Sequence, residues 1–317
     1  MTVRVQTETS QSAPAAQSVP AARSALFARL VEIGGGPPDA AAAAVTLYDR
    51  HGVLVVRVGD VAVKAHQPDR ELGPEFADRI RLAAALPHIL LGPAGPPVDA
   101  DGRTVTVAPY GEPVDPARDL PWEEGARLLA ALHRVPVPAG APSWGRPERV
   151  ARLVGRLGAG PAEDAVRRAF AGLPAWIRGE GAEPPRAREC VVHGDWHLGQ
   201  MVRARDGWRL IDIEDLGRGD PAWDLARPAA LYCAGVLDPA EWERFLGAYR
   251  DAGGPAVPPD GDPWAALDIP ARSLAIQIAA TCVQSARKGD RPLDGPEEAM
   301  VDACRRMACI EIGGEPA

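Results

Sequence analysis

Two neighbouring stretches of this 317-residue chain decide its fold: VHGDWHLGQ at Val192–Gln200 and LIDIED at Leu210–Asp215. Runs of apolar and β-branched residues predict three short strands here, at Cys190–His193, Met201–Arg203 and Trp208–Ile213. Arg205, Asp206 and Gly207 form a turn signal between the last two strands. The polar residues of both stretches are therefore expected in loops that rigid strands hold in place.

These polar residues follow the spacing of a kinase catalytic loop. Asp195 lies in a His-x-Asp turn, Gln200 follows five residues later, and Asp212 ends an apolar strand. The kinase pattern H-R-D-x-x-x-x-N, with its later metal-binding aspartate, has the same order. Phosphoryl transfer needs one carboxylate facing the attacking hydroxyl and further oxygen donors that hold magnesium on the nucleotide phosphates. We expect Asp195 to be catalytic and Gln200 and Asp212 to bind Mg²⁺.

With the further motif GDPAWDLA at Gly219–Ala226, the chain resembles the aminoglycoside phosphotransferase family. That family shares its fold with choline kinases and, more distantly, with protein kinases. The resemblance implies transfer of the γ-phosphate of ATP, with Mg²⁺, to a hydroxyl of a small molecule such as an aminoglycoside, a sugar or an amino sugar. It also implies that His193, His197 and Asp224 support the catalytic loop.

Gln200 stands where the family usually has asparagine, and the chain contains no asparagine at all. The run His-Leu-Gly-Gln at His197–Gln200 is similar to bacterial maltokinases and glucosamine kinases, which implies a carbohydrate acceptor. Glutamine carries the same amide oxygen on one more methylene, so it can coordinate a metal if the loop backs away slightly. The expected magnesium amide is therefore Gln200.

An antiparallel meander is expected before this region, with strands at Ala44–Tyr48, Val53–Val58, Val61–His66 and Thr104–Pro109 and a helix at Pro74–Leu86. Val61–Lys64 resembles the V-A-I-K strand whose lysine contacts the α and β phosphates. The chain has only two lysines, Lys64 and Lys288, and arginine fills most other basic positions. We therefore expect Lys64 to bind the nucleotide.

The acid expected to pair with Lys64 is Glu75 or Glu71, or neither, and Glu75 is favoured over Glu71 because it lies within the helical pattern. Glu75 equally suits a solvated carboxylate at the start of that helix. Backbone groups of the hinge, at Val107, Pro109 and Tyr110, are expected to bind adenine. The three glycines at Gly34–Gly36 are interpreted as a helix stop, and the turn near Asp49 to Gly52 is the better candidate for a nucleotide contact.

The predicted fold class is α+β: a two-lobed protein-kinase-like fold with a small N-terminal antiparallel sheet lobe and a larger, mainly helical C-terminal lobe. We expect a disordered tail at 1–23, a nucleotide-binding lobe at 24–109, and a catalytic and substrate-binding lobe at 110–317. Helices of the second lobe are predicted at Trp122–His133, Glu148–Leu157, Ala162–Ile177, Pro221–Gly235, Pro239–Ala252, Pro270–Lys288 and Pro296–Ile310.

The formal net charge of −8 and the pI near 5.4 argue against a nucleic-acid or anionic-membrane partner. Five cysteines without a C-x-x-C pair favour reduced thiols in the cytoplasm. The apolar stretch Leu274–Val283 is too short to cross a bilayer, which needs about 20 residues. We expect a cytoplasmic protein with a small-molecule partner, and the composition leaves the oligomeric state open.

Two other interpretations stay open. A nucleotide-binding pseudokinase would keep the fold without turnover, and the replacement at Gln200 motivates it. A metal-dependent hydrolase would use His193 and His197 with Asp212 and Asp215 as ligands. The acids Glu214 and Asp215 equally suit a second magnesium or the solvated start of a loop.

Overall fold

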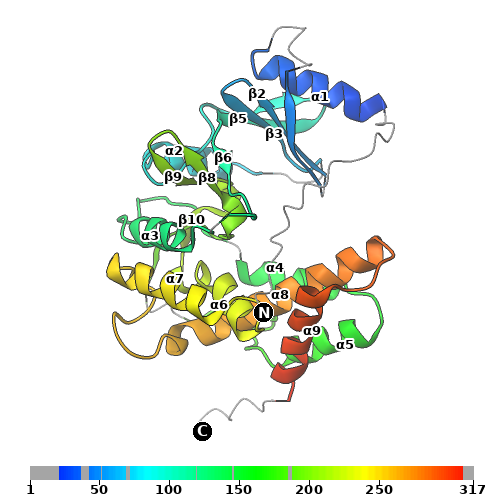
Figure 1. Ribbon diagram of the computed structural model, residues 1–317, viewed down its shortest axis with the longest axis vertical. Coiled ribbons are helices and arrows are strands. Elements are labelled where there is room, and N and C mark those ends of the chain that lie inside the picture. Colours follow the sequence, from blue (N-terminus) through cyan, green and yellow to red (C-terminus); the bar gives the residue numbers. More distant parts are fainter. Residues whose placement is uncertain are drawn as a thin grey trace.

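The computed structural model describes residues 21–36, 43–50, 52–68, 72–118, 120–144, 146–184 and 188–309 (Figure 1). An antiparallel sheet with one helix lies at one end, and most helices gather at the other. This is the protein-kinase-like arrangement that the sequence predicts. The expected tail, together with Glu71 and His51, lies largely or wholly outside the described residues.

The N-terminal sheet has five strands in the order β1-β2-β3-β5-β4, and every neighbouring pair is antiparallel. Burial alternates along β2, so Leu54, Val56 and Val58 face the core beneath α1. α1 ends at Ile33, and the amide nitrogen of the next residue, Gly34, bonds to Leu30 O at 2.9 Å, so the helix stops at the glycine run as predicted. The bounds of these elements are α1 Ala21–Ile33, β1 Val45–Arg50, β2 Val53–Val58, β3 Val61–Ala65, α2 Glu75–Ala84, β4 Val98–Ala100 and β5 Arg103–Pro109.

The C-terminal part is mainly helical and encloses two apolar cores. One core joins α3 to α7, and the other joins α4, α5, α8 and α9. The helices are α3 Trp122–His133, α4 Arg146–Gly155, α5 Pro161–Ala171, α6 Ala226–Cys233, α7 Pro239–Asp251, α8 Trp264–Lys288 and α9 Gly295–Met307. Two small sheets carry the site, formed by β6 Glu112–Pro113, β7 Cys190–Val192, β8 Met201–Ala204, β9 Gly207–Leu210 and β10 Gly217–Gly219.

Helix α8 begins at Trp264, six residues before the proline at which the sequence analysis placed its start. Pro270 lies inside the helix, where it removes one backbone hydrogen bond. Leu267 and Ala271 on either side are buried, so packing outweighs that loss. α8 is long and apolar enough to span a membrane by length and composition, but most of its apolar window is buried against neighbouring helices.

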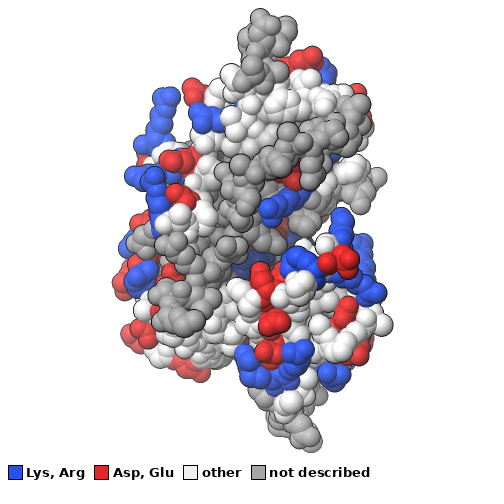
Figure 2. Space-filling model, turned by 45° about the vertical axis from the view of Figure 1, so that its right-hand side comes forward, with Lys and Arg blue, Asp and Glu red and all other residues white. Residues whose placement is uncertain are grey.

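Charge on the surface is mixed. On the face drawn in Figure 2, blue basic and red acidic side chains lie interspersed over both parts of the molecule. Most ion pairs of the described residues with both members well exposed join residues three or four positions apart, such as Arg29 with Glu32. Such pairs contribute little stability each.

The buried carboxylate of Asp224 fixes the backbone at the start of the catalytic loop, which is the segment His193–Gln200. It accepts hydrogen bonds from the backbone N–H groups of His193 at 2.7 Å and Gly194 at 2.8 Å. The His133 imidazole donates to the same carboxylate at 3.0 Å, and Tyr249 OH bonds the other ring nitrogen at 2.7 Å. The hydroxyl of Tyr249 also accepts from Ala256 N. α3, α7 and the loop before Asp195 thereby meet at one buried group.

Burial alone would raise the pKa of Asp224, but the hydrogen bond from His133 and the backbone bond from His193 hold the pKa below its usual value. A carboxyl whose folded pKa is lowered stabilises the folded state above its unfolded pKa, near 3.9, and loses that contribution as pH falls through the folded pKa. Asp224 therefore stabilises the protein at neutral pH in its charged form.

We predict that Asp224→Asn lowers the free energy of unfolding by about 3 kcal/mol at pH 7, because the amide N–H₂ would replace one acceptor oxygen and face a hydrogen-bond donor instead of accepting from it. Urea unfolding followed by circular dichroism measures this loss. The difference from the wild type should shrink below about pH 4. Asp251→Asn, an exposed change in α7, is the control and should shift stability by less than about 0.5 kcal/mol. Equal losses for the two variants would contradict the assigned role.

Candidate active site

The catalytic loop alternates between an inward and an outward side chain. Trp196 is buried and stacks on Phe245 of α7 with ring centroids 5.3 Å apart. Gly125 of α3 makes room for it, since a Cβ there would lie 2.5 Å from the indole ring. Because Trp196 is fixed in the core, the preceding side chain, Asp195, points to the partly exposed side of the loop.

The two histidines of the loop brace its backbone. His193 Nε2 donates to Ile211 O at 2.7 Å, which ties the catalytic loop to the segment that carries Asp212. His197 Nδ1 accepts from Gly199 N at 3.0 Å and caps the short 3-10 turn Leu198–Gln200. Both imidazoles thus lie where a loop-supporting role requires them.

The acidic segment after β9, Asp212–Asp215, turns sharply. Asp212 has φ +63°, a left-handed conformation that non-glycine residues rarely adopt and that clusters at functional sites. A short 3-10 turn over Ile213–Asp215 follows and buries Ile213. The carboxylates of Asp212 and Glu214 both reach Lys64, whereas that of Asp215 pairs with Arg149.

Lys64 reaches across from β3 to two of these acids. Its Nζ lies 2.9 Å from Asp212 Oδ1 and 2.6 Å from Glu214 Oε1. Burial alone would lower the pKa of Lys64, but the charges of Asp212 and Glu214 outweigh burial and raise that pKa above its usual value. His66, two residues further along the chain, also bonds Glu214, at 2.7 Å, and its other nitrogen contacts Thr106 Oγ1 at 3.0 Å. Lys64 is therefore charged and held in place on β3, the central strand of the sheet.

The expected pairing of Lys64 with Glu75 is wrong. Glu75 lies at the exposed start of α2 and pairs with Arg79 one helical turn later, at 3.2 Å. Arg79 also donates to Ser143 O at 3.1 Å, so it ties α2 to the C-terminal part. The physical reason is that the Lys64 ammonium already pairs with Glu214 of the 3-10 turn and with Asp212. Glu71 lies outside the described residues.

Asp195 is held by two arginines that the sequence analysis did not single out. Arg149 Nη1 of α4 donates to Asp195 Oδ2 at 2.9 Å, and Arg227 Nη2 of α6 approaches Asp195 Oδ1 at 3.3 Å. The other nitrogen of Arg149 donates to Asp215 at 2.5 Å. Nearly all basic residues of this chain are arginines, so nothing in the local sequence distinguishes Arg149 and Arg227 from the others. Arg227 carries one signal, since it directly follows the Gly219–Ala226 motif.

Gln200 and Asp212 lie together, with Gln200 Nε2 3.1 Å from Asp212 Oδ2. An amide and a carboxylate are the hard oxygen donors that Mg²⁺ prefers, and rotation of the amide about its last bond would turn its oxygen toward the same space. Gln200 therefore reaches the carboxylate of Asp212, although it stands where the family usually has the shorter asparagine. The residues present fit a magnesium ion.

The hinge residues lie at the end of β5, but two of their backbone groups are already bonded within the protein. Tyr110 N donates to Asp60 O at 2.8 Å, and Val107 O accepts from Ala94 N at 2.8 Å. Pro109 has no N–H to offer. The guanidinium of Arg57 covers the Tyr110 ring at 3.8 Å. Adenine binding by these residues stays a prediction, as does a nucleotide contact at Asp49 to Gly52.

The hydrolase interpretation finds no support in this geometry. His193 and His197 use ring nitrogens to hold backbone groups, as described above. Among residues 21–309 that the structure describes, no group of three His, Cys, Asp or Glu side chains could hold a metal ion. The ligand set expected for zinc therefore does not converge.

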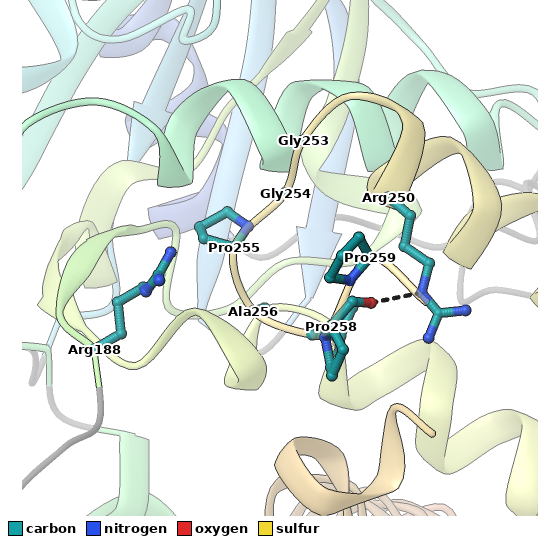
Figure 3. Close-up of a pocket in the computed structure, with 9 residues that line it drawn as sticks. Arg188, Arg250, Gly253, Gly254, Pro255, Ala256, Pro258 and Pro259 are labelled. Atoms are coloured by element: carbon teal, nitrogen blue, oxygen red, sulfur yellow. Dashed lines mark hydrogen bonds between the residues drawn. The ribbon is translucent and has the colours of Figure 1, made fainter. Parts of the chain in front are cut away.

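A hollow among the described residues lies away from these groups. Figure 3 shows it beside the loop after α7, with Arg188 and Arg250 at its rim and a wall of glycines and prolines. The Arg250 guanidinium is committed to that loop, because Nε donates to Pro258 O at 3.0 Å. None of its lining residues belongs to the site around Asp195.

Comparisons with known proteins identify the family and the fold of this chain. Residues 45–267 match the Phosphotransferase enzyme family (APH). No curated protein matches the sequence. A choline/ethanolamine kinase family protein from Mesorhizobium loti has 18% identity and a TM-score of 0.55, covering 92% of this chain and 95% of its own.

Two further solved structures contain bound ligands. An amicoumacin kinase in complex with AMP-PNP, Ca²⁺ and its substrate has 16% identity and a TM-score of 0.58, covering 86% of this chain and 88% of its own. A spectinomycin phosphotransferase in complex with ADP and spectinomycin has 11% identity and a TM-score of 0.55, covering 84% and 92%. At such identities these structures show the shared fold.

The family match spans more than half of the chain, and it includes Lys64, the catalytic loop and the acidic segment after β9. The chain therefore belongs to the APH phosphotransferase enzyme family of small-molecule kinases.

Proposed function

We propose that this protein transfers the γ-phosphate of ATP to a hydroxyl group of a small molecule in the cytoplasm. The observation that carries this proposal is the shared carboxylate of Asp212, which meets Lys64 on one oxygen and Gln200 on the other. A phosphate-binding cation and a metal-binding pair are thus brought together from β3, the catalytic loop and the segment after β9. The nucleotides bound to two solved relatives support ATP as the donor.

Each side chain has a defined part in this reaction. Lys64 places a compact positive charge against the nucleotide phosphates. Asp195 accepts a hydrogen bond from the acceptor hydroxyl, orients its oxygen for in-line attack and receives its proton. Gln200 and Asp212 would hold Mg²⁺, which when bound neutralises charge on the β and γ phosphates. Fixed by Trp196, His193 and Asp224, the loop keeps these groups aligned.

The acceptor is a small hydroxyl compound. The His-Leu-Gly-Gln run supports a sugar or amino sugar, whereas the structural relatives act on compounds as different as spectinomycin and amicoumacin. An ADP-release screen over aminoglycosides, amino sugars, maltose and choline tests the acceptor and the activity together. ADP release that depends on one of these compounds is the expected result.

A second candidate is a nucleotide-binding pseudokinase, and one observation favours it. Both oxygens of Asp195 have arginine partners, which compete with an acceptor hydroxyl. Each carboxylate oxygen has two lone pairs, so an arginine partner does not by itself prevent that oxygen from accepting a hydrogen bond from a hydroxyl. We therefore favour the active kinase, and turnover with any acceptor eliminates the pseudokinase.

We predict that Lys64→Met raises the KM for ATP and lowers kcat/KM for ATP by about 100-fold, because the phosphates lose a charge-assisted partner. Steady-state ADP release at varied ATP measures both constants. Lys288→Met is the matched control, since Lys288 is the only other lysine and is exposed at the end of α8. Unchanged constants in an active preparation of the Lys64 variant would refute the nucleotide-binding role.

We predict that Asp195→Asn lowers kcat by about 100- to 10,000-fold, because the amide cannot take the proton of the hydroxyl. ATP binding, measured by calorimetry, should stay within about three-fold of the wild type since Asp195 faces the acceptor. Loss of ATP affinity equal to the loss of kcat would instead indicate that the loop has collapsed.

We predict that Gln200→Ala raises the Mg²⁺ concentration for half-maximal ADP release about ten-fold or more, since one oxygen ligand is lost. Gln200→Asn keeps the amide and should stay closer to the wild type. A magnesium titration at saturating ATP distinguishes the two variants. If Gln200→Ala titrates like the wild type, the amide is not a ligand.

A further inference from the structure

The catalytic carboxylate belongs to a compact four-charge cluster. Asp195 and Asp215 supply two negative charges, and Arg149 and Arg227 supply two positive ones. Arg149 is the centre, because one guanidinium donates to Asp195 at 2.9 Å and to Asp215 at 2.5 Å. The four side chains are each between 21% and 28% exposed, so a ligand at the site can reach them.

Arg149 is held by its helix. Its neighbour Val150 and, further along α4, Val154 are buried in the core that α4 shares with α8. Burial alone would lower the pKa of Arg149, but the carboxylates of Asp215 and Asp195 outweigh it and raise that pKa. The guanidinium is therefore charged at every working pH, and its position is fixed by packing as well as by charge.

The charge balance decides which acceptors the site tolerates. Two carboxylates beside an attacking hydroxyl would attract a compound with several protonated amines, since unit charges about 4 Å apart interact by several kcal/mol near a protein surface. In this cluster both carboxylates are already neutralised by guanidinium groups. A polycation would meet the positive charges of Arg149 and Arg227 as well as the acids, and would gain no net attraction.

We propose that Arg149 is a specificity-determining residue, which neutralises Asp195 and Asp215 and reserves the acceptor site for uncharged or anionic hydroxyl compounds, such as neutral sugars, over polycations. This inference rests on the proposed function for the identity of the acceptor side. The charge cluster itself rests only on the ion pairs above. It narrows the open acceptor class by excluding compounds with several amines.

Binding of kanamycin, a polycationic aminoglycoside, tests the proposal as a gain of affinity. Calorimetry at low salt compares the wild type with Arg149→Gln, which removes one positive charge and leaves Asp215 without this partner. We expect Arg149→Gln to bind kanamycin at least about ten-fold more tightly, with the gain shrinking as salt screens the charges. A misfolded variant cannot produce such a gain.

Two controls separate this effect from a general change of charge. Arg152→Gln removes an exposed arginine from the same helix and should leave kanamycin affinity within about two-fold of the wild type. The double variant Arg149→Gln with Asp215→Asn restores the net charge and should cancel most of the gain. Tight kanamycin binding by the wild type, or a gain equal in Arg149→Gln and Arg152→Gln, would overturn the proposal.

Failure of this inference and failure of the proposed function give different results. ADP release that is the same in the wild type and Asp195→Asn refutes the kinase proposal, whatever the kanamycin affinities are. Conversely, Asp195-dependent turnover with kanamycin as a good acceptor of the wild type supports the kinase and refutes the role of Arg149.

Discussion

The buried carboxylate of Asp224 sets the backbone of the catalytic loop, and the remaining site geometry depends on it. Two consecutive backbone N–H groups converge on that carboxylate, and this is possible only because Gly194 adopts a left-handed φ of +84°. A side chain at Gly194 would lie 2.4 Å from Asp215 O, so the loop also packs directly on the acidic segment. The catalytic loop and the acidic segment therefore pack against each other as one unit.

From that unit the charges divide into two groups. Lys64, Asp212, Glu214 and Gln200 form one group at the sheet, where we propose that the nucleotide binds. Arg149, Arg227, Asp195 and Asp215 form the other group at the helices, where we propose that the acceptor binds. The two groups separate within the 3-10 turn Ile213–Asp215, since Glu214 pairs with Lys64 and the next residue, Asp215, pairs with Arg149. A short segment of chain thus serves both sides of one reaction.

Sequence reasoning predicted the fold because strand patterns are local signals. The spacing from Asp195 to Asp212 is local as well, and the reacting residues that it indicates stay a prediction. It missed β10, since a three-residue strand with two glycines carries no pattern and forms only by pairing with β7. It also chose Glu75 over Glu214 for Lys64, because helix position is visible in sequence whereas the path of a tight turn is not. Arg149 was invisible for a related reason, as its partners lie 46 and 66 residues away.

The partners of Lys64 have a mechanical consequence. In this protein the lysine of the sheet is bonded to two acids that belong to the helical part, and α2 is tied to the same part through Arg79 and Ser143. Any opening motion of the sheet away from the helices must break two charged contacts at the lysine and stretch a third link at α2. Lys64 therefore also holds the sheet to the helical part, and a ligand that competes for its charge would weaken the contact between the two parts of the molecule.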